Sequence, residues 1–147
     1  PEIDVELLEL VTLGTAHIAG YSLDGKVNAA LMLYEALCRF LNVSNTLRRE
    51  DFLPDPAGEM IELDTSDSSE QELLHRAVKA IYDIRQDDAR LRGIISQPPG
   101  RRGDYFDRLR RDYPTRREAG RTRIRLQPGR TELAEKLTGL GFQVENP

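Results

Sequence analysis

Several features that mark secreted, membrane-spanning or nucleic-acid-binding proteins are scarce or missing in this chain. A single cysteine, Cys38, excludes an internal disulfide and favours a reducing compartment such as the cytoplasm. No apolar run approaches the roughly 20 residues that span a bilayer, and no signal peptide is visible. A formal net charge of −4 argues against general binding to nucleic acid or to a membrane surface. The sequence opens at Pro1 rather than at Met, which suggests a piece of a longer protein.

The composition that remains is that of a folded protein with a modest core. The 147 residues are 39% hydrophobic and 31% charged, which disfavours wholesale disorder. Apolar periodicity lapses over residues 42–58, where two prolines and a glycine break regular structure. We therefore predict a first region at 1–41, a linker at 42–58 and a separate domain at 59–147.

The first region reads as two short elements followed by a long helix. Residues 3–10 are typical of a short helix or turn, and residues 11–16 of a short strand that ends in a loop. Ser22 or Asp24 can cap a helix that ends at Asn42. One apolar face repeats at spacings of three and four along it: Val27, Ala30, Leu31, Tyr34, Leu37, Cys38 and Leu41. Such a face is normally covered, so we expect this region to be mobile, swapped, or packed against a neighbouring copy.

The second region alternates strands with helices. Strands are predicted at 60–64, 122–127 and 142–145, and helices at about 70–82, 87–95, 104–113 and 131–140. Ser69 and Glu72 have the spacing of a capping box, which places the start of the first of these helices. Three strands with about four helices predict a small α+β domain.

His17 has surroundings that suit chemistry, although a histidine in such a loop is more often structural. Gly14, Gly20 and Gly25 surround it, and glycine lets the backbone approach a ligand closely. The first turn of the following helix directs its N–H groups back toward this loop, a setting that favours an anion. An imidazole can give and take a proton near neutral pH.

The segment 15–26 (TAHIAGYSLDGK) resembles the active-site loop T-P-H-I-A-G of the NAD-dependent D-2-hydroxyacid dehydrogenases. Two further stretches, 82–88 (YDIRQDD) and 106–118 (FDRLRRDYPTRRE), together with 140–142, resemble the C-terminal extension of one branch of that family. That branch acts on a small phosphorylated hydroxyacid on the route to pyridoxal 5'-phosphate. The sequence departs from the family pattern at Ala16, where most members have proline.

The resemblance implies a role for three residues of this loop. His17 would exchange a proton with the substrate hydroxyl, Gly20 would lie against the cofactor NAD, and Tyr21 would contact the substrate at its phosphate end. Residues 1–41 would form the trailing edge and exit helix of a Rossmann-type domain. Residues 59–147 would form a dimerisation domain, and the protein would be a homodimer.

Parts of such an enzyme are missing from the sequence. There is no G-x-G-x-x-G, and the arginine and glutamate that the family places upstream of the histidine are absent. Without them the substrate is not held and the histidine is not oriented, so we expect the isolated chain to be inactive. The alternative is a non-catalytic interaction or dimerisation module that carries a dehydrogenase-like tail.

Two charged clusters have competing interpretations. Asp83, Asp87 and Asp88 could suggest a metal site, but helix capping and ion pairs with Arg85 or Arg92 are favoured, and we expect no metal. Residues 101–130 contain 11 arginines and four acidic residues. Since few aromatic residues are interleaved with them, pairing with acidic protein surface is favoured over nucleic-acid binding.

Overall fold

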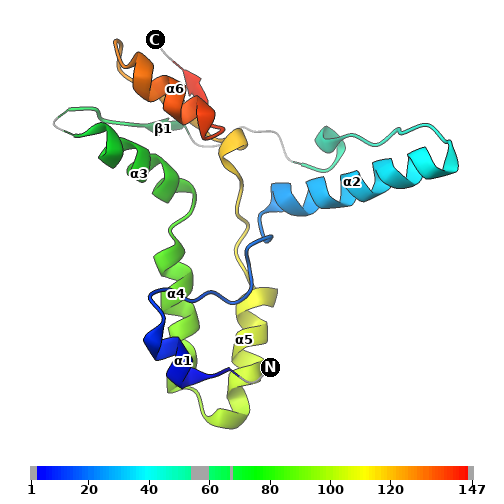
Figure 1. Cartoon of the computed structure of the whole chain (residues 1–147), viewed down its shortest axis with the longest axis vertical. Coiled ribbons are helices and arrows are strands. Elements are labelled where there is room, and N and C mark those ends of the chain that lie inside the picture. Colours follow the sequence, from blue (N-terminus) through cyan, green and yellow to red (C-terminus); the bar gives the residue numbers. More distant parts are fainter. Residues whose placement is uncertain (1–2, 54–59, 67, 146–147) are drawn as a thin grey trace. The chain divides into compact units, whose positions relative to one another are not determined.

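The computed structural model describes residues 3–53, 60–66 and 68–145 (Figure 1). Its contacts group the chain into two compact units. The helical unit comprises Pro1–Tyr21 and Asp83–Thr115, and the sheet unit comprises Ser22–Tyr82 and Arg116–Pro147. Together the described residues form six α-helices and one three-stranded sheet, in agreement with the α+β prediction.

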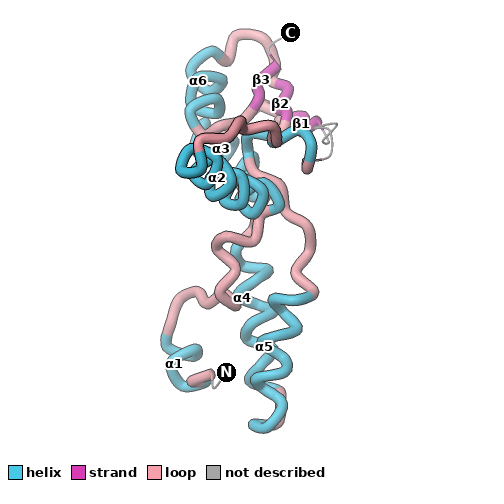
Figure 2. Tube along the Cα trace, turned by 90° about the vertical axis from the view of Figure 1, so that its right-hand side faces the viewer, coloured by secondary structure: helices cyan, strands magenta, loops and turns pink. Residues whose placement is uncertain are grey.

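The sheet has three short parallel strands in the order β1-β2-β3 (Figure 2). They are β1 (Met60–Glu62), β2 (Arg123–Arg125) and β3 (Gln143–Glu145). Ile124 on the central strand lies opposite both Ile61 and Val144. Neighbouring parallel strands need a crossover connection, and α6 (Thr131–Gly139) supplies the one between β2 and β3.

The core of the sheet unit lies between the sheet and two helices, α6 and α3 (Glu70–Ile81). Helix α3 begins with the predicted capping box, in which Ser69 and Glu72 bond each other's backbone N–H groups. Val78, which the apolar pattern places on the buried face of α3, is instead exposed. The buried apolar side chains are Leu63, Leu73, Ala77, Ile124, Leu126, Leu133, Ala134, Leu137 and Phe142.

Helix α2 (Leu23–Leu41) is the long predicted helix, and it ends where Asn42 takes a left-handed conformation with φ of 54°. Residues 42–53, which include a 3-10 turn at Arg49–Asp51, return along it; the backbone N–H of Thr46 donates to the Tyr34 hydroxyl. Much of its apolar surface stays uncovered within the described residues, because Leu33 is 74% and Phe40 85% exposed.

The helical unit consists of a hairpin of α4 (Ile84–Arg92) and α5 (Arg102–Arg111) together with α1 (Val5–Leu10). Two 3-10 turns, Gly93–Ser96 and Pro99–Arg101, connect α4 to α5. Buried apolar side chains are fewer here, and Leu8, Leu91 and Ile94 are among them. The Tyr105 hydroxyl donates a 2.8 Å hydrogen bond to the Arg90 carbonyl and thereby ties α5 to α4.

The prediction of a strand at 11–16 is wrong. These residues form bends and irregular backbone, because their polar groups bond side chains of α4 instead of a neighbouring strand. Arg92 donates to the carbonyls of Leu8 and Val11 at 2.8 Å each. The Gly14 N–H donates to Asp88 Oδ1 at 2.8 Å. Side chains 74 and 81 positions away, which local sequence patterns do not reveal, therefore set the course of this segment.

The order of elements predicted for the second region is confirmed: strand, three helices, strand, helix, strand. Bounds differ by a few residues; the helix expected at 87–95 is α4 followed by a 3-10 turn, and the one expected at 104–113 is α5. Residues 54–58 of the predicted linker lie outside the described residues. The domain limits at 41 and 58 stay a prediction.

Candidate active-site segment

The loop that carries His17 is anchored by the residues on either side of it. Ala16 is 4% and Ile18 2% exposed, and both lie beside Leu109 and Tyr113 of the α4–α5 hairpin region. Alternation of buried and exposed positions therefore fixes the backbone and leaves the side chain of His17 on the outside.

The backbone of His17 adopts a conformation that is unusual for a residue with a side chain. Its φ is 56°, in the left-handed region, where a non-glycine residue costs about 1 kcal/mol or more. Such strain persists only when neighbouring contacts impose it, and strained backbone is concentrated at functional sites. The imidazole is exposed, so a ligand or another protein segment can reach it.

A short turn leads from His17 to the two other residues of the predicted site. The Tyr21 N–H donates to the Ile18 carbonyl at 3.0 Å, which places Gly20 at the outer side of the turn. Apart from Gly20 itself and its two chain neighbours, no heavy atom of the described residues lies within 4 Å of the position that a Cβ would occupy on Gly20. The backbone at this point consequently leaves room for close approach by a ligand.

Tyr21 lies within a cluster of aromatic and charged side chains. Its ring meets the Tyr113 ring edge to face, with centroids 5.7 Å apart and planes at 86°. The Arg110 guanidinium lies 5.7 Å from the Tyr21 ring centroid, within reach of a cation–π interaction. The Tyr113 hydroxyl donates to Asp87 at 2.8 Å, and Asp87 also pairs with Arg90 at 3.5 Å. The cluster joins the histidine loop to both helices of the hairpin.

Arg110 and Tyr113 are not among the residues to which the motif resemblance gives a role. Both lie in the stretch 106–118, whose pattern assigns no role to its individual members. The sequence feature that indicates a shared location for these residues is helical spacing, because positions 106, 109, 110 and 113 fall on one side of a helix.

The start of α2 is joined to residues 116–118. Ser22 is the N-cap residue, which accepts from the Gly25 N–H at 2.9 Å, and its hydroxyl donates to Glu118 at 2.7 Å. Leu23 N–H donates to the Arg116 carbonyl at 2.8 Å. The motif at 15–26 and the motif at 106–118, nearly 100 residues apart in the sequence, are thus in direct contact. This contact explains part of why both motifs occur in the same chain.

Asp24, the other predicted cap, is a fully buried carboxylate with three arginines around it. Its oxygens lie 3.0 Å from Arg117 Nε, 3.1 Å from an Arg49 Nη and 3.8 Å from Arg121 Nε. The Glu118 N–H adds a hydrogen bond of 3.0 Å. Burial alone would raise the pKa of Asp24, but hydrogen bonds from Arg117, Glu118 and Arg49 hold it below the ordinary value of 3.8.

The aspartates around α4 are used in capping and ion pairs, as predicted. Asp83 caps α4 and pairs with Arg85, and Asp88 pairs with Arg92 at 2.9 Å. The pKa of Asp88 is lowered, first by Arg92 and then by the Gly14 N–H. Over residues 3–53, 60–66 and 68–145, no cluster of three His, Cys, Asp or Glu side chains has the arrangement of a metal site.

Arginines of the basic stretch 101–130 also pair with acidic groups of the same chain. Their partners are Asp24 for Arg117 and Arg121, Glu145 for Arg123, and Glu62 and Glu145 for Arg125. The Arg116 guanidinium also lies over the Tyr82 ring, 4.2 Å from its centroid. Within the described part of the chain, no helix has both the length and the apolar character that a membrane span requires.

Comparison with known proteins gives a consistent family assignment. Residues 52–141 match the model of the domain of unknown function DUF3410. Erythronate-4-phosphate dehydrogenase of Marinobacter nauticus is 41% identical over 145 residues, which are 99% of this chain and 38% of the relative. The enzyme of that name from Pseudomonas putida F1 is 42% identical over 141 residues, 96% of this chain and 37% of the relative.

The Hahella chejuensis enzyme of the same name is 36% identical over 146 residues, 99% of this chain and 38% of the relative. The chain therefore spans less than two-fifths of the length of these curated relatives. It belongs to the DUF3410 family, and it is similar over nearly its whole length to the part of erythronate-4-phosphate dehydrogenases that includes this C-terminal domain.

Proposed function

We propose that this chain is the C-terminal part of an NAD-dependent dehydrogenase that oxidises 4-phospho-D-erythronate to the 2-oxo acid in pyridoxal 5'-phosphate synthesis. The observation that carries the proposal is the similarity to enzymes of that name over 99% of the chain, histidine loop included. The exposed, strained His17 and the open backbone at Gly20 are compatible with it. A single buried thiol, Cys38, suits a reducing cytoplasm.

In this proposal the loop residues divide the chemistry among them. Bound NAD would supply the hydride acceptor, and Gly20 would allow its close approach. His17 would take the proton of the 2-hydroxyl group while hydride leaves C2, so that the alcohol becomes a ketone. Tyr21 would contact the substrate at its phosphate end. Residues 1–41 would form the trailing edge and exit helix of a Rossmann-type domain whose strands lie in the remainder of the enzyme.

We propose that the isolated chain forms a homodimer and has no catalytic activity. Residues 59–147 would form the homodimer contact, which is self-complementary in a two-fold dimer. The chain alone would not turn over substrate, because the upstream arginine and glutamate of the family are absent. Light scattering at high micromolar concentration is expected to give the mass of a dimer, whereas a monomer would contradict the assignment of residues 59–147.

A chimera tests the catalytic part of the proposal. The upstream part of the Marinobacter nauticus enzyme, which precedes the region aligned with this chain, is joined to Pro1. The chimera is expected to form NADH from 4-phospho-D-erythronate, and the 147-residue chain is expected to form none. His17→Asn in the chimera should lower kcat by about 100- to 10,000-fold, since it removes the proton acceptor.

Each result bears on a separate statement. Turnover by the isolated chain would refute its inactivity, and an unchanged kcat in His17→Asn would refute the role of His17. A folded, dimeric chimera without activity would favour the alternative, a non-catalytic interaction or dimerisation module.

A further inference from the structure

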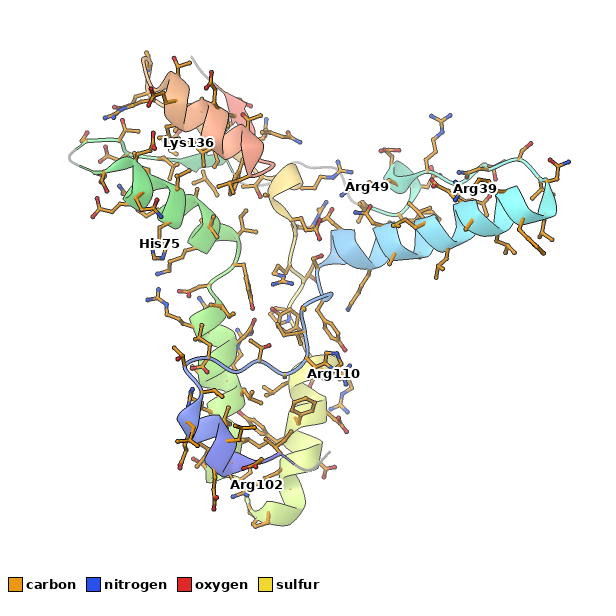
Figure 3. All side chains as sticks on the ribbon, viewed as in Figure 1. Arg39, Arg49, His75, Arg102, Arg110 and Lys136 are labelled. Atoms are coloured by element: carbon orange, nitrogen blue, oxygen red, sulfur yellow. The ribbon has the colours of Figure 1, made fainter. Side chains whose placement is uncertain are left out.

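Arg110 occupies an unusual position among the arginines of the helical unit. It lies in the last turn of α5, close to the histidine loop (Figure 3), and its guanidinium lies over the Tyr21 ring at 5.7 Å from the centroid. Its Nε atom is buried and has no hydrogen-bond partner. A buried donor without a partner is unfavourable, so the contacts around it hold this nitrogen in place.

Asp87, the acidic residue of the cluster around Tyr113, has partners other than Arg110. Asp87 accepts from the Tyr113 hydroxyl and pairs with Arg90. Of the ion pairs described within residues 3–53, 60–66 and 68–145, none includes Arg110, whereas Arg111 beside it pairs with Asp112 at 3.1 Å. Among the described residues, no carboxylate therefore lies within ion-pair distance of the Arg110 guanidinium.

A guanidinium over an aromatic ring keeps its N–H groups directed outward in its own plane. That edge matches two oxygens of a phosphate or carboxylate, and Arg forms such paired hydrogen bonds better than Lys. Packing against Tyr21, which in turn packs against Tyr113, limits the rotation of the side chain. The contact with Tyr21 thus orients the guanidinium, a group whose N–H edge suits an anion.

We propose that Arg110 binds the phosphate group of the substrate, beside Tyr21. This inference rests on the function proposed above and adds to it a residue that determines specificity for a phosphorylated acid. Of the two anionic groups of such a substrate, the phosphate is chosen because it carries the larger charge and because Tyr21 is the residue assigned to that end. His17, four residues earlier, would act at the other end.

The first experiment measures KM in the chimera for Arg110→Met, Arg110→Lys and the control Arg111→Met. Methionine preserves most of the packing on Tyr21 but removes the charge. KM for 4-phospho-D-erythronate is expected to rise about 10- to 100-fold in Arg110→Met, with a smaller change in kcat. Its preference for the phosphorylated over the unphosphorylated acid should fall. Arg110→Lys should restore part of the affinity, and Arg111→Met should behave as wild type.

The second experiment does not depend on turnover. The 147-residue chain is titrated with inorganic phosphate while the Nε–H resonance of Arg110 is followed by NMR. A saturable shift that is absent in Arg110→Met, and present in Arg111→Met, supports the site. If the chimera is inactive, the titration alone tests the role of Arg110. A shift would then support an anion site at Arg110 even though the dehydrogenase function had failed, and the absence of a shift would overturn the site. In an active chimera, an unchanged KM in Arg110→Met overturns the proposal.

Discussion

The sheet unit and the helical unit are stabilised in different ways. The sheet unit has a continuous apolar core, with Ile124, Leu73 and Leu137 completely buried. The helical unit buries fewer apolar side chains and instead ties its segments together through charged side chains, with Arg92 and Asp88 bonded to backbone groups of α1 and the following loop. The candidate catalytic loop, which carries His17, belongs to the helical unit, where such polar contacts tie the segments together. Polar ties specify a backbone path closely, whereas apolar burial supplies most of the free energy of folding.

The largest effect is expected in the apolar core. Ile124→Ala should lower the free energy of unfolding by about 2–5 kcal/mol, since it empties a fully buried position on the central strand. Urea denaturation followed by circular dichroism measures the loss. Leu140→Ala is the control, because that side chain is 51% exposed. Equal losses at both positions would mean that the sheet unit is not held by this core.

The next effect concerns the buried charge in the sheet unit. Asp24→Asn should cost about 3 kcal/mol, because it leaves Arg117, Arg49 and Arg121 without their shared carboxylate. Since folding lowers the pKa of Asp24, its contribution is present above pH 4 and is lost as the pH falls through the lower, folded-state pKa.

Denaturation curves collected from pH 7 downward test this dependence. The wild-type protein should lose stability on acidification more steeply than Asp24→Asn. Asp112→Asn, at an exposed ion pair, serves as control and should keep the wild-type slope. Parallel pH profiles for wild type and Asp24→Asn would show that the carboxylate contributes nothing.

The smallest effect should be local to the helical unit. Arg92→Met removes the hydrogen bonds to the Leu8 and Val11 carbonyls and should destabilise the attachment of α1 by about 1.5–3 kcal/mol. Hydrogen exchange should speed up in residues 5–14 and stay unchanged in the sheet unit. Arg85→Met, which breaks an exposed pair with Asp83, should leave those rates alone. Faster exchange throughout the chain would show that the two units are not separately stabilised.

Sequence patterns predict correctly those helix starts and ends that depend on residues close together in the sequence. The capping box at Ser69 and Glu72, the N-cap at Ser22 and the stop at Asn42 all involve groups within one helical turn. These signals were therefore sufficient to place α2 and α3.

The failures involve partners far away in the sequence. The segment 11–16 has the composition of a strand, but Arg92 and Asp88 take up its backbone hydrogen-bonding groups. The parallel pairing of the sheet was not predicted, because strand composition does not state which strands are neighbours. The motif points to His17, Gly20 and Tyr21 of the candidate site, whereas the position of Arg110 depends on a contact with the Tyr21 ring that no local pattern contains.

The contact between Tyr82 and Arg116 has an architectural consequence. These residues flank the stretch 83–115, and their side chains meet at 4.2 Å, so the two ends of that stretch leave and re-enter the sheet unit at nearly one point. The α4–α5 hairpin is in this sense an insertion into a strand–helix–strand scaffold. Insertions with adjoining ends can be gained, lost or exchanged without rebuilding the host. The scaffold that supplies the core and the hairpin that supports the histidine loop are therefore modules that evolution or design could alter one at a time.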